Sequence, residues 1–408
     1  KKNKIIVAPM KGTINRGINI EEDRLKKVLL INSEKEKAEN LMIVDLMRND
    51  IGKFADVGSV KVNKLFKVEK YETLYQMISV IKAKIKEQKL SDILLNIFPC
   101  GSITGAPKIR TMEIIKEIEK ENRGIYTGAI GFVYNKNYNV NVAIRTLVIK
   151  KENKRGELGI GSGIVWDGIA DKEYDEVKLK SYFLTKPFIY FELFETILIE
   201  NKKVFLLDKH LKRLKLTAKY FLFCFNEKKV LNGINSLIEL LDNNNYKVKI
   251  TLNKWGNIKF DYELLETKIE NIKIIISNKQ ISSDNKFQYF KTTLRSLYNN
   301  ELIKYKKRGF SEVLFLNENN LIAEGSFTNI FINKEGKLTT PQISNGLLNG
   351  IYRQKLLEKI KDIKECDVAI SDLIAADSIF VCNSVRKEIN VSEIWYNNNC
   401  IWQKKITA

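Results

Sequence analysis

Two glutamates and a lysine near residue 175 are spaced as though they share one face of a helix. Glu173, Glu176 and Lys180 are separated by three and four residues, so a helix places their side chains together. Two carboxylates beside a lysine suit a magnesium ion that binds an anionic substrate. A solvated face held by salt bridges is the alternative. The upstream glycines Gly161 and Gly163 favour a binding site, because backbone N–H groups there can approach a carboxylate closely.

Two further features of the first half suit the binding of anions. The segment 98–108 is rich in glycine and proline and leads into a predicted helix that Pro107 opens, as anion-binding loops often do. Arg145 is predicted to lie in a largely apolar strand, where a bidentate carboxylate partner would account for its guanidinium. Both features predict an anionic ligand for this half.

Lys291 and Glu324 in the second half suit a cofactor with a pyridine ring. Lys291 stands at a predicted strand end before a helix, and Glu324 follows a hairpin turn in a predicted strand. A lysine that forms a Schiff base and an acid that faces a pyridine nitrogen are what pyridoxal phosphate needs. Its phosphate needs an arginine and backbone N–H groups at a helix start, for which the candidates are Arg213, Arg353 and Arg386. Taken singly, each of these residues also fits an ordinary solvated position.

Elements on each side of residues 185–187 must position these groups. In the first half an apolar stripe predicts a helix over 69–89, further helices are predicted over 108–121 and 171–184, and strands at 5–7, 125–134, 140–149 and 158–166. The segment ending at Pro187 is typical of a linker, so we expect domains at 1–184 and 188–408. The sequence begins at Lys1 inside a predicted strand, and we expect further chain upstream.

The second half repeats the alternation of strands and helices. Its predicted helices cover 208–223 and 295–307, with another that starts near residue 350. Strands are predicted at 188–200, 246–253, 271–277, 313–316 and 322–332, with a further strand that ends at residue 382.

Composition excludes several classes of protein. The chain carries 69 Lys and Arg against 49 Asp and Glu, a net charge of +20, but 12 of those 69 are Arg and the lysines are scattered among asparagines. This favours a lysine-biased solvated surface over a nucleic-acid interface. Five dispersed cysteines and one histidine argue against a disulfide framework, a zinc site and a Ser-His-Asp triad. No apolar run reaches the roughly 18 residues of a membrane span, so we expect a cytoplasmic protein.

The first half resembles the chorismate-binding family, which includes anthranilate synthase, aminodeoxychorismate synthase component I, and the isochorismate and salicylate synthases. The matching blocks follow in order at 45–50, 98–108, 123–128, 144–146, 161–165 and 173–180. The resemblance implies Mg²⁺ on the ring carboxylate of the substrate, with Glu39, Glu173 and Glu176 as its ligands. It also implies substrate-binding residues, which are Tyr126, Arg145, Gly161 and Lys180 for the enolpyruvyl carboxylate and Gly12, Thr13 and Gly163 around the ring.

Lys11 distinguishes members of that family. Aminodeoxychorismate synthases carry Lys in the motif that here reads Pro9-Met10-Lys11-Gly12-Thr13, whereas anthranilate synthases carry Ala. The resemblance therefore implies that Lys11 attacks chorismate before ammonia replaces it. Gln76 stands where family members often have a histidine, which weakens any role for an imidazole there.

The second half resembles the fold type IV pyridoxal-phosphate enzymes, which include aminodeoxychorismate lyase, branched-chain aminotransferase and D-amino acid aminotransferase. The blocks lie at 194–196, 210–214, 324–331, 346–353 and 383–386, together with Lys291. The resemblance implies that Lys291 forms the Schiff base and Glu324 faces the pyridine nitrogen. It assigns the phosphate to Arg213, Ile351 and Ser384, and we expect His210 to be structural.

Together the two halves predict an α+β protein in which the C-terminal part of a chorismate-utilising fold precedes a fold type IV domain. The predicted function is the two-step formation of 4-aminobenzoate for folate: amination of chorismate to 4-amino-4-deoxychorismate, then elimination of pyruvate with pyridoxal phosphate. Alternatives are a branched-chain or D-amino acid transaminase fused to a degenerate chorismate domain, and an anthranilate synthase-like first half. The sequence has no glutamine amidotransferase signature, so we expect a separate amidotransferase subunit or free ammonium, and a homodimer through the second domain.

Overall fold

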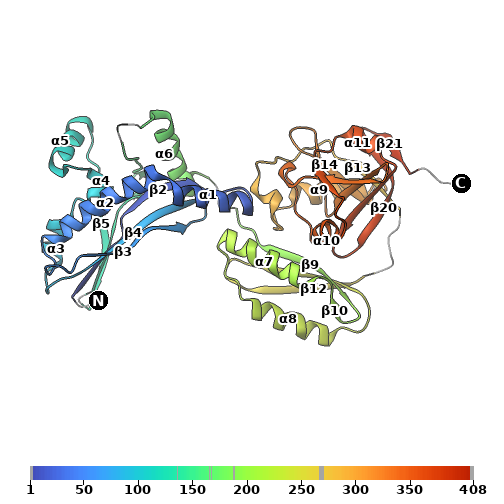
Figure 1. Cartoon of the computed structure of the whole chain (residues 1–408), viewed down its shortest axis with the longest axis horizontal. Coiled ribbons are helices and arrows are strands. Elements are labelled where there is room, and N and C mark those ends of the chain that lie inside the picture. The colour runs from blue at the N-terminus through green and yellow to red at the C-terminus, as the bar shows by residue number, and fades with distance from the viewer. Residues whose placement is uncertain are drawn as a thin grey trace. The chain divides into compact units, whose positions relative to one another are not determined.

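The computed structural model describes residues 3–135, 137–164, 166, 168–186, 189–265 and 271–404. The chain divides into two compact units (Figure 1). Unit 1 comprises Lys1–Gly17 and Glu21–Ile189, and unit 2 comprises Ile18–Ile20 and Tyr190–Ala408. Pro187, the last residue of the expected linker, and Phe188, the first residue of the strand predicted at 188–200, lie outside the described residues, as does Val165 of the 161–165 block. None of the described helices is long and apolar enough to cross a membrane.

Unit 1 is built on an antiparallel sheet whose central strand is β4 (Leu74–Lys84). Strands β1 (Lys4–Val7) and β2 (Met10–Asn15) pair along one edge of β4, and β3 (Lys61–Lys70) pairs along the other. The prediction of a helix over 69–89 is therefore wrong. Leu74 through Ser79 are all buried, so the run lacks the alternation that marks a half-exposed strand. Helices α1 (Ile20–Asn32) and α2 (Glu34–Gly52) follow β2.

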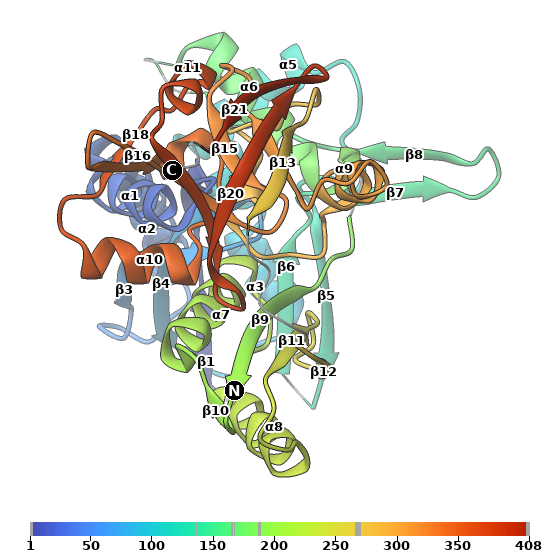
Figure 2. The same ribbon diagram turned by 90° about the vertical axis from the view of Figure 1, so that its right-hand side faces the viewer.

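The remainder of unit 1 consists of short helices and two hairpins. The helices are α3 (Leu90–Ile97), α4 (Gly101–Thr104), α5 (Lys108–Ile118) and α6 (Ala170–Thr185), of which α5 and α6 were predicted. Strands β5 (Ala129–Tyr134) and β6 (Asn137–Val142) form one hairpin, and β7 (Leu147–Lys150) and β8 (Arg155–Leu158) form the other, which extends as a pair in Figure 2. The predicted strand over 140–149 is broken at Arg145, whose φ is 51°. The prediction of a strand over 158–166 is also wrong, since none follows Leu158 in the described residues.

Unit 2 begins with a four-stranded antiparallel sheet in the order β10 (Lys203–Val204), β9 (Leu193–Glu200), β11 (Tyr246–Leu252), β12 (Ile258–Leu264). Helices α7 (Leu207–Phe221) and α8 (Glu227–Leu240) pack on it through a core that includes Leu211, Ile234 and Val248. Sequence patterns predicted β9, α7 and β11 but missed α8 and β12.

A nine-stranded mixed sheet forms the rest of unit 2, and Figure 2 shows its strands β13 and β20 side by side. Its strands are β13 (Ile272–Ile276), β14 (Glu312–Leu316), β15 (Ile322–Gly325), β16 (Asn329–Lys334), β17 (Lys337–Pro341), β18 (Lys364–Cys366), β19 (Ser378–Asn383), β20 (Lys387–Tyr396) and β21 (Asn399–Gln403). Its helices are α9 (Ser296–Lys306), α10 (Ile351–Lys359) and α11 (Ile370–Ile374). The predicted hairpin after residue 313 exists, although residues 326–328 interrupt its second strand between β15 and β16.

Candidate functional site

Lys11 stands on a bulge in strand β2 of unit 1. The register of the β2–β4 pair shifts here, and Gly12 adopts a φ of 92° that favours glycine. Two buried side-chain amides donate hydrogen bonds to the backbone carbonyls of the bulge. Asn40 Nδ2 donates to the Lys11 carbonyl at 3.3 Å, and Gln76 Nε2 donates to the Gly12 carbonyl at 2.9 Å. Gln76 thus anchors the backbone of the segment that carries Lys11.

The neighbours of this bulge include other predicted residues. Thr13 Oγ1 donates to Gln76 Oε1 at 3.2 Å. A Cβ on Gly163 would collide with Lys11 Nζ, so the amine lies directly against that glycine. A Cβ on Gly12 would approach a carboxylate oxygen of Glu36 to 3.0 Å. The predicted ring-framing residues and the lysine are therefore brought to one place.

Two glutamates of α2 lie near Lys11, and two glutamates of α6 contact Ser162, the neighbour of Gly163. Lys11 Nζ is 3.9 Å from Glu39 Oε2, and the Ser162 hydroxyl donates to both Glu173 and Glu176. Burial, together with the charges of Glu39 and Glu176, raises the pKa of Glu36 above its usual value. Glu36 was missed from sequence. The signal was available, because α2 carries Glu36 and Glu39 three residues apart, just as α6 carries Glu173 and Glu176.

The carboxylates of these four glutamates supply hard oxygen donors, which are the ligands that Mg²⁺ prefers. In the described part of the chain, no three acidic, histidine or cysteine side chains converge closely enough to hold a metal ion as they stand. Burial is the largest cause of the raised pKa of Glu36, and the charges of Glu39 and Glu176 add to it; a divalent cation would relieve that repulsion. The chemistry of the donor set therefore fits the ion.

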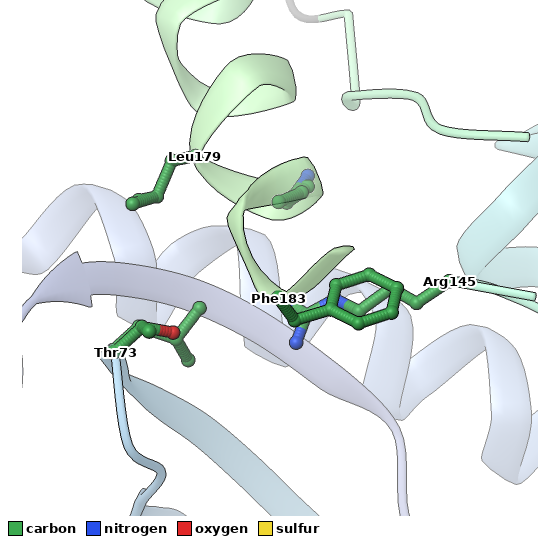
Figure 3. A pocket seen from close by; sticks show the side chains of 6 residues that line it. Thr73, Arg145, Leu179 and Phe183 are labelled. Atoms are coloured by element: carbon green, nitrogen blue, oxygen red, sulfur yellow. The ribbon is translucent and has the colours of Figure 1, made fainter. Parts of the chain in front are cut away.

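The residues predicted to bind the enolpyruvyl carboxylate of the substrate lie around Gly161. Lys180 Nζ donates to the Gly161 carbonyl at 3.1 Å and pairs with Glu176 at 2.8 Å. A Cβ on Gly161 would lie 2.8 Å from the Tyr126 hydroxyl, whose pKa burial raises. Lys180 and Arg145 line one pocket of about 90 Å³ together with Thr73, Leu74, Leu179 and Phe183, and Figure 3 shows the Phe183 ring beside Arg145.

The predicted anion-binding loop at 98–108 packs against helix α2. Lys108, the first residue of α5, donates to the buried carboxylate of Asp50 at 2.6 Å. A Cβ on Gly101 would collide with the side chain of Leu46. The loop is thus fastened to the same helix that carries Glu36 and Glu39.

In unit 2, Lys291 lies half-buried with its amine 4.6 Å from the centre of the Phe194 ring. Burial and the guanidinium groups of Arg213 and Arg295 lower its pKa to about 7. Its Nζ makes no hydrogen bond or ion pair to any residue that the structure describes. An unpaired amine of lowered pKa can form a Schiff base at neutral pH.

Glu324 on β15 is buried and hydrogen-bonded by two donors. Its Oε1 accepts from the Tyr298 hydroxyl at 2.9 Å, and its Oε2 accepts from the backbone N–H of Leu348 at 3.0 Å. Burial raises the pKa of Glu324 to about 7, and Lys291 is among the charges that act on it. An acid in this setting can share a proton with a pyridine nitrogen.

Arg213 is held by a buried network on β9 and α7. Its Nε and Nη2 donate to the two oxygens of Glu195 at 2.7 and 2.6 Å, and His210 Nδ1 donates to Glu195 Oε2 at 2.7 Å. Burial alone would raise the pKa of Glu195, but Arg213 and His210 hold it at about 2. Burial lowers the pKa of His210. His210 thus orients the carboxylate that orients Arg213.

The segment that leads into α10 connects these groups. Leu348 donates to Glu324, the Asn349 carbonyl accepts from Arg213 Nη1 at 3.4 Å, and α10 begins at Ile351, where backbone N–H groups lack partners inside the helix. Ser384 follows β19, and its hydroxyl has no hydrogen-bond partner among the described residues.

Arg353, one of the candidate phosphate ligands, has its guanidinium bonded to other protein groups and does not offer it to a phosphate. Its side chain is fully buried and donates to Asn349, to the Pro341 carbonyl at 2.9 Å and to Glu365 at 2.6 Å.

Two protein families match the chain. Residues 1–186 match the family described as chorismate binding enzyme, and residues 192–394 match amino-transferase class IV. The predicted fold class, a chorismate-binding domain followed by a fold type IV domain, is confirmed.

Curated relatives match the first unit. Aminodeoxychorismate synthase, chloroplastic, from Arabidopsis thaliana is 44% identical over 176 residues, which is 42% of this chain and 19% of that protein. Aminodeoxychorismate synthase component 1 from Escherichia coli is 46% identical over 43% of this chain and 38% of its own length. Anthranilate synthase component 1 from Aquifex aeolicus is 39% identical over 46% of this chain and 38% of its own length. The chain therefore spans between about a fifth and two fifths of these relatives.

Solved structures resemble the second unit. A Legionella pneumophila protein assigned provisionally as a 4-amino-4-deoxychorismate lyase has a TM-score of 0.48 at 18% identity, and covers 55% of this chain and 92% of that one. A branched-chain aminotransferase from Thermoproteus uzoniensis has a TM-score of 0.48 at 19% identity, and covers 53% of this chain and 81% of that one.

Proposed function

Because the chain joins a chorismate-binding domain to an amino-transferase class IV domain, we propose that it forms 4-aminobenzoate from chorismate in two steps. Unit 1 aminates chorismate to 4-amino-4-deoxychorismate, and unit 2 eliminates pyruvate from that product. The observation that carries the proposal is the pair of lysines in opposite surroundings, Lys11 among carboxylates and Lys291 beside guanidinium groups.

In the first step, Lys11 is the nucleophile. Its Nζ forms a bond to the ring carbon of chorismate as the C–O bond to the 4-hydroxyl breaks and water leaves. Ammonia then forms the new C–N bond and releases Lys11. Glu39, Glu173 and Glu176 would hold Mg²⁺, which would neutralise the negative charge of the ring carboxylate that these glutamates otherwise repel.

The same unit binds the rest of the substrate. Arg145 and Lys180, which line one pocket, bind the enolpyruvyl carboxylate with the Tyr126 hydroxyl and the backbone at Gly161. Gly12, Thr13 and Gly163 frame the ring, and the contact between Gly163 and Lys11 supports this placement.

The residues of unit 2 fit pyridoxal phosphate. Lys291 has an amine without a partner in the described chain, Ser384 has a hydroxyl without one, and Ile351 offers the N–H groups of a helix start. Arg213, whose guanidinium Glu195 holds in place, would bind the phosphate, and Glu324, which accepts from the backbone of Leu348, would pair with the ring nitrogen.

Pyridoxal phosphate supplies an electron sink when it is bound at this site. Lys291 removes the proton from C4 of 4-amino-4-deoxychorismate with its amine. The C–O bond between the ring and the enolpyruvyl group then breaks, its electron pair leaves with enolpyruvate, which gains the abstracted proton to become pyruvate, and the ring becomes aromatic. Aromatisation drives the step, so the protein mainly orients the C–H bond and binds the anionic substrate.

Two alternatives differ from this proposal at named residues. An anthranilate synthase-like unit 1 would have no use for a lysine at residue 11, whereas an amination through Lys11 does. A transaminase built on unit 2 would use Lys291 and Glu324 equally well, so the choice between lyase and transaminase depends on the fusion to unit 1.

The lyase step is tested by incubating the protein with pyridoxal phosphate and 4-amino-4-deoxychorismate. We expect one pyruvate for each 4-aminobenzoate without any added 2-oxo acid, and no product from the Lys291→Ala variant. Amino transfer that requires a 2-oxo acid acceptor would establish the transaminase instead.

The remaining partners and the location are part of the same proposal. Ammonia comes from a separate glutamine amidotransferase subunit or from free ammonium, the protein acts in the cytoplasm, and unit 2 forms a homodimer. Gel filtration with light scattering tests the dimer, and dependence on added glutaminase tests the nitrogen source.

A further inference from the structure

Arg295 is a half-buried cation beside the candidate cofactor site that the proposed function does not use. It lies four residues after Lys291, at the position that precedes α9, and its side chain makes no capping hydrogen bond to that helix. Its Nη2 donates to the carbonyl of Ser326, and its guanidinium lies 4.7 Å from the centre of the Tyr298 ring. Tyr298 in turn donates to Glu324. Arg295 therefore belongs to the same cluster as Lys291 and Glu324.

The charge of Arg295 is not balanced as that of Arg213 is. Arg213 makes two hydrogen bonds to the Glu195 carboxylate. Arg295 has no carboxylate within 4 Å among the described residues, and its protein hydrogen bond is to a neutral carbonyl. Its charge also lowers the pKa of both Lys291 and Glu324. A half-buried guanidinium with a neutral partner is costly unless an anionic ligand completes it.

A buried glutamate holds in place the turn whose Ser326 carbonyl accepts a hydrogen bond from Arg295. Glu312 is fully buried, and its carboxylate accepts from the backbone of Val313 at 2.8 Å, the backbone of Ser326 at 2.9 Å and the hydroxyl of Thr328 at 2.7 Å. The Ser326 hydroxyl donates to it as well. The turn that contains the Ser326 carbonyl is thus hydrogen-bonded to the Glu312 carboxylate. The acceptor that orients Arg295 is therefore fixed in the protein without a ligand.

We propose that Arg295 binds an anionic oxygen of the ligand held at Lys291. The inference rests on the proposed function of unit 2 and deepens it. The shared chemistry is a guanidinium that meets an oxyanion, and the oxyanion has two possible sources: a carboxylate of the substrate, which carries two, or an anionic oxygen of the cofactor. A second cation at the site suits a dianionic substrate better than an amino acid with one carboxylate.

The test compares Arg295→Gln and Arg295→Lys with the control Arg308→Gln. Arg308 follows the same helix, lies 5.3 Å from the Tyr305 ring and donates to the neutral oxygen of Asn398 at 2.9 Å, and it is not among the main charges that shift the pKa of Lys291. The cofactor affinity of each variant is measured by absorbance titration. The binding of benzene-1,3-dicarboxylate and of benzoate to the loaded protein is then measured by calorimetry.

We expect Arg295→Gln to weaken one of these interactions by roughly 10- to 100-fold, since a hydrogen bond to a charged group contributes about 1.5–3 kcal/mol. Weaker binding of the dicarboxylate with unchanged cofactor affinity identifies the substrate as the source. Weaker cofactor affinity with an altered absorbance spectrum identifies the cofactor. Arg295→Lys keeps the charge and retains part of the binding in either case.

A folded Arg295→Gln protein that matches Arg308→Gln in every measurement overturns the inference. Failure of the proposed function is distinguishable, because it shows as a wild-type protein that binds no pyridoxal phosphate through Lys291. Circular dichroism tests whether each variant is folded. If Arg295→Gln does not fold, the binding of cofactor and dicarboxylate is measured on Arg295→Lys instead.

Discussion

The two units place a lysine in opposite electrostatic surroundings. Lys11 in unit 1 lies 3.9 Å from Glu39, in a group of glutamates whose mutual repulsion contributes to the raised pKa of Glu36. Lys291 in unit 2 lies near Arg213 and Arg295, and these charges help to lower its pKa to about 7.

The difference shows what each site lacks. A bound cation balances the negative charge of clustered carboxylates, and a bound anion balances the positive charge of clustered guanidinium groups. Unit 1 therefore suits a divalent metal that carries an anionic substrate, and unit 2 suits an anionic cofactor and substrate directly. Removing a single charge at either site tests this difference.

The largest expected effect comes from Glu195, which balances Arg213 in unit 2. Its pKa of about 2 lies below the usual 4.5, so its contribution to stability is present above pH 4.5 and is lost as the pH falls toward 2. We expect Glu195→Gln to lower the free energy of unfolding by about 3–5 kcal/mol at pH 7, because it leaves a largely buried guanidinium unpaired. Urea unfolding at pH 7 and pH 3 measures this.

The control for Glu195 is Glu358→Gln, which removes an exposed partner of Lys209 and should change stability by less than about 1 kcal/mol. Equal losses in the two variants at pH 7, or a loss in Glu195→Gln that does not shrink at pH 3, would contradict the account of unit 2.

A smaller effect of the opposite sign is expected at Lys291. Its pKa is lowered from 10.5 to about 7, so neutralising it on folding costs stability below pH 10.5, and that cost disappears at higher pH. We expect Lys291→Met to raise the free energy of unfolding of the cofactor-free protein by about 1–3 kcal/mol at pH 7. Lys337→Met, at an exposed lysine of β17, is the matched control and should have no such effect. A destabilised Lys291→Met protein would show that the site is not strained by its cations.

The smallest effect is expected at Glu36 in unit 1. Because its pKa is raised, the metal-free protein should become more stable as the pH falls from 7 toward 4.5. Glu36→Gln should remove that dependence, raise the stability of the metal-free protein slightly, and reduce the stabilisation that Mg²⁺ provides. Thermal unfolding in chelator and in Mg²⁺ measures both quantities. Glu34→Gln, an exposed neighbour on α2, serves as the control, and equal Mg²⁺ responses in the two variants would remove Glu36 from the metal site.

Local patterns predicted the elements whose periodicity survives in the fold. The helix carrying Glu173 and Glu176 and the helix after Arg295 both lie close to their expected positions, because each keeps a helical spacing or a clear start. The stripe at Leu74 to Ile81 predicted a helix and is a central strand, since burial on both faces removes the alternation of a strand.

The sites were predictable in their residue types and not in their contacts. Arg145 was placed in a strand and lies in a bend with a positive φ, which no local pattern indicated. The buried carboxylate of Glu312 and its turn were missed because the partners, Ser326 and Thr328, lie 14 and 16 residues away in sequence. Pairings at that separation are set by the sheet.

The central claim, that one chain uses Lys11 and then Lys291 to make 4-aminobenzoate, is tested most directly by product analysis. The full-length protein is supplied with chorismate, ammonium, Mg²⁺ and pyridoxal phosphate, and its products are compared with those of Lys291→Ala and Lys11→Ala. The account predicts 4-aminobenzoate and pyruvate from the wild type, accumulation of 4-amino-4-deoxychorismate by Lys291→Ala, and neither amine from Lys11→Ala. Formation of 2-aminobenzoate, unchanged in Lys291→Ala, would contradict it.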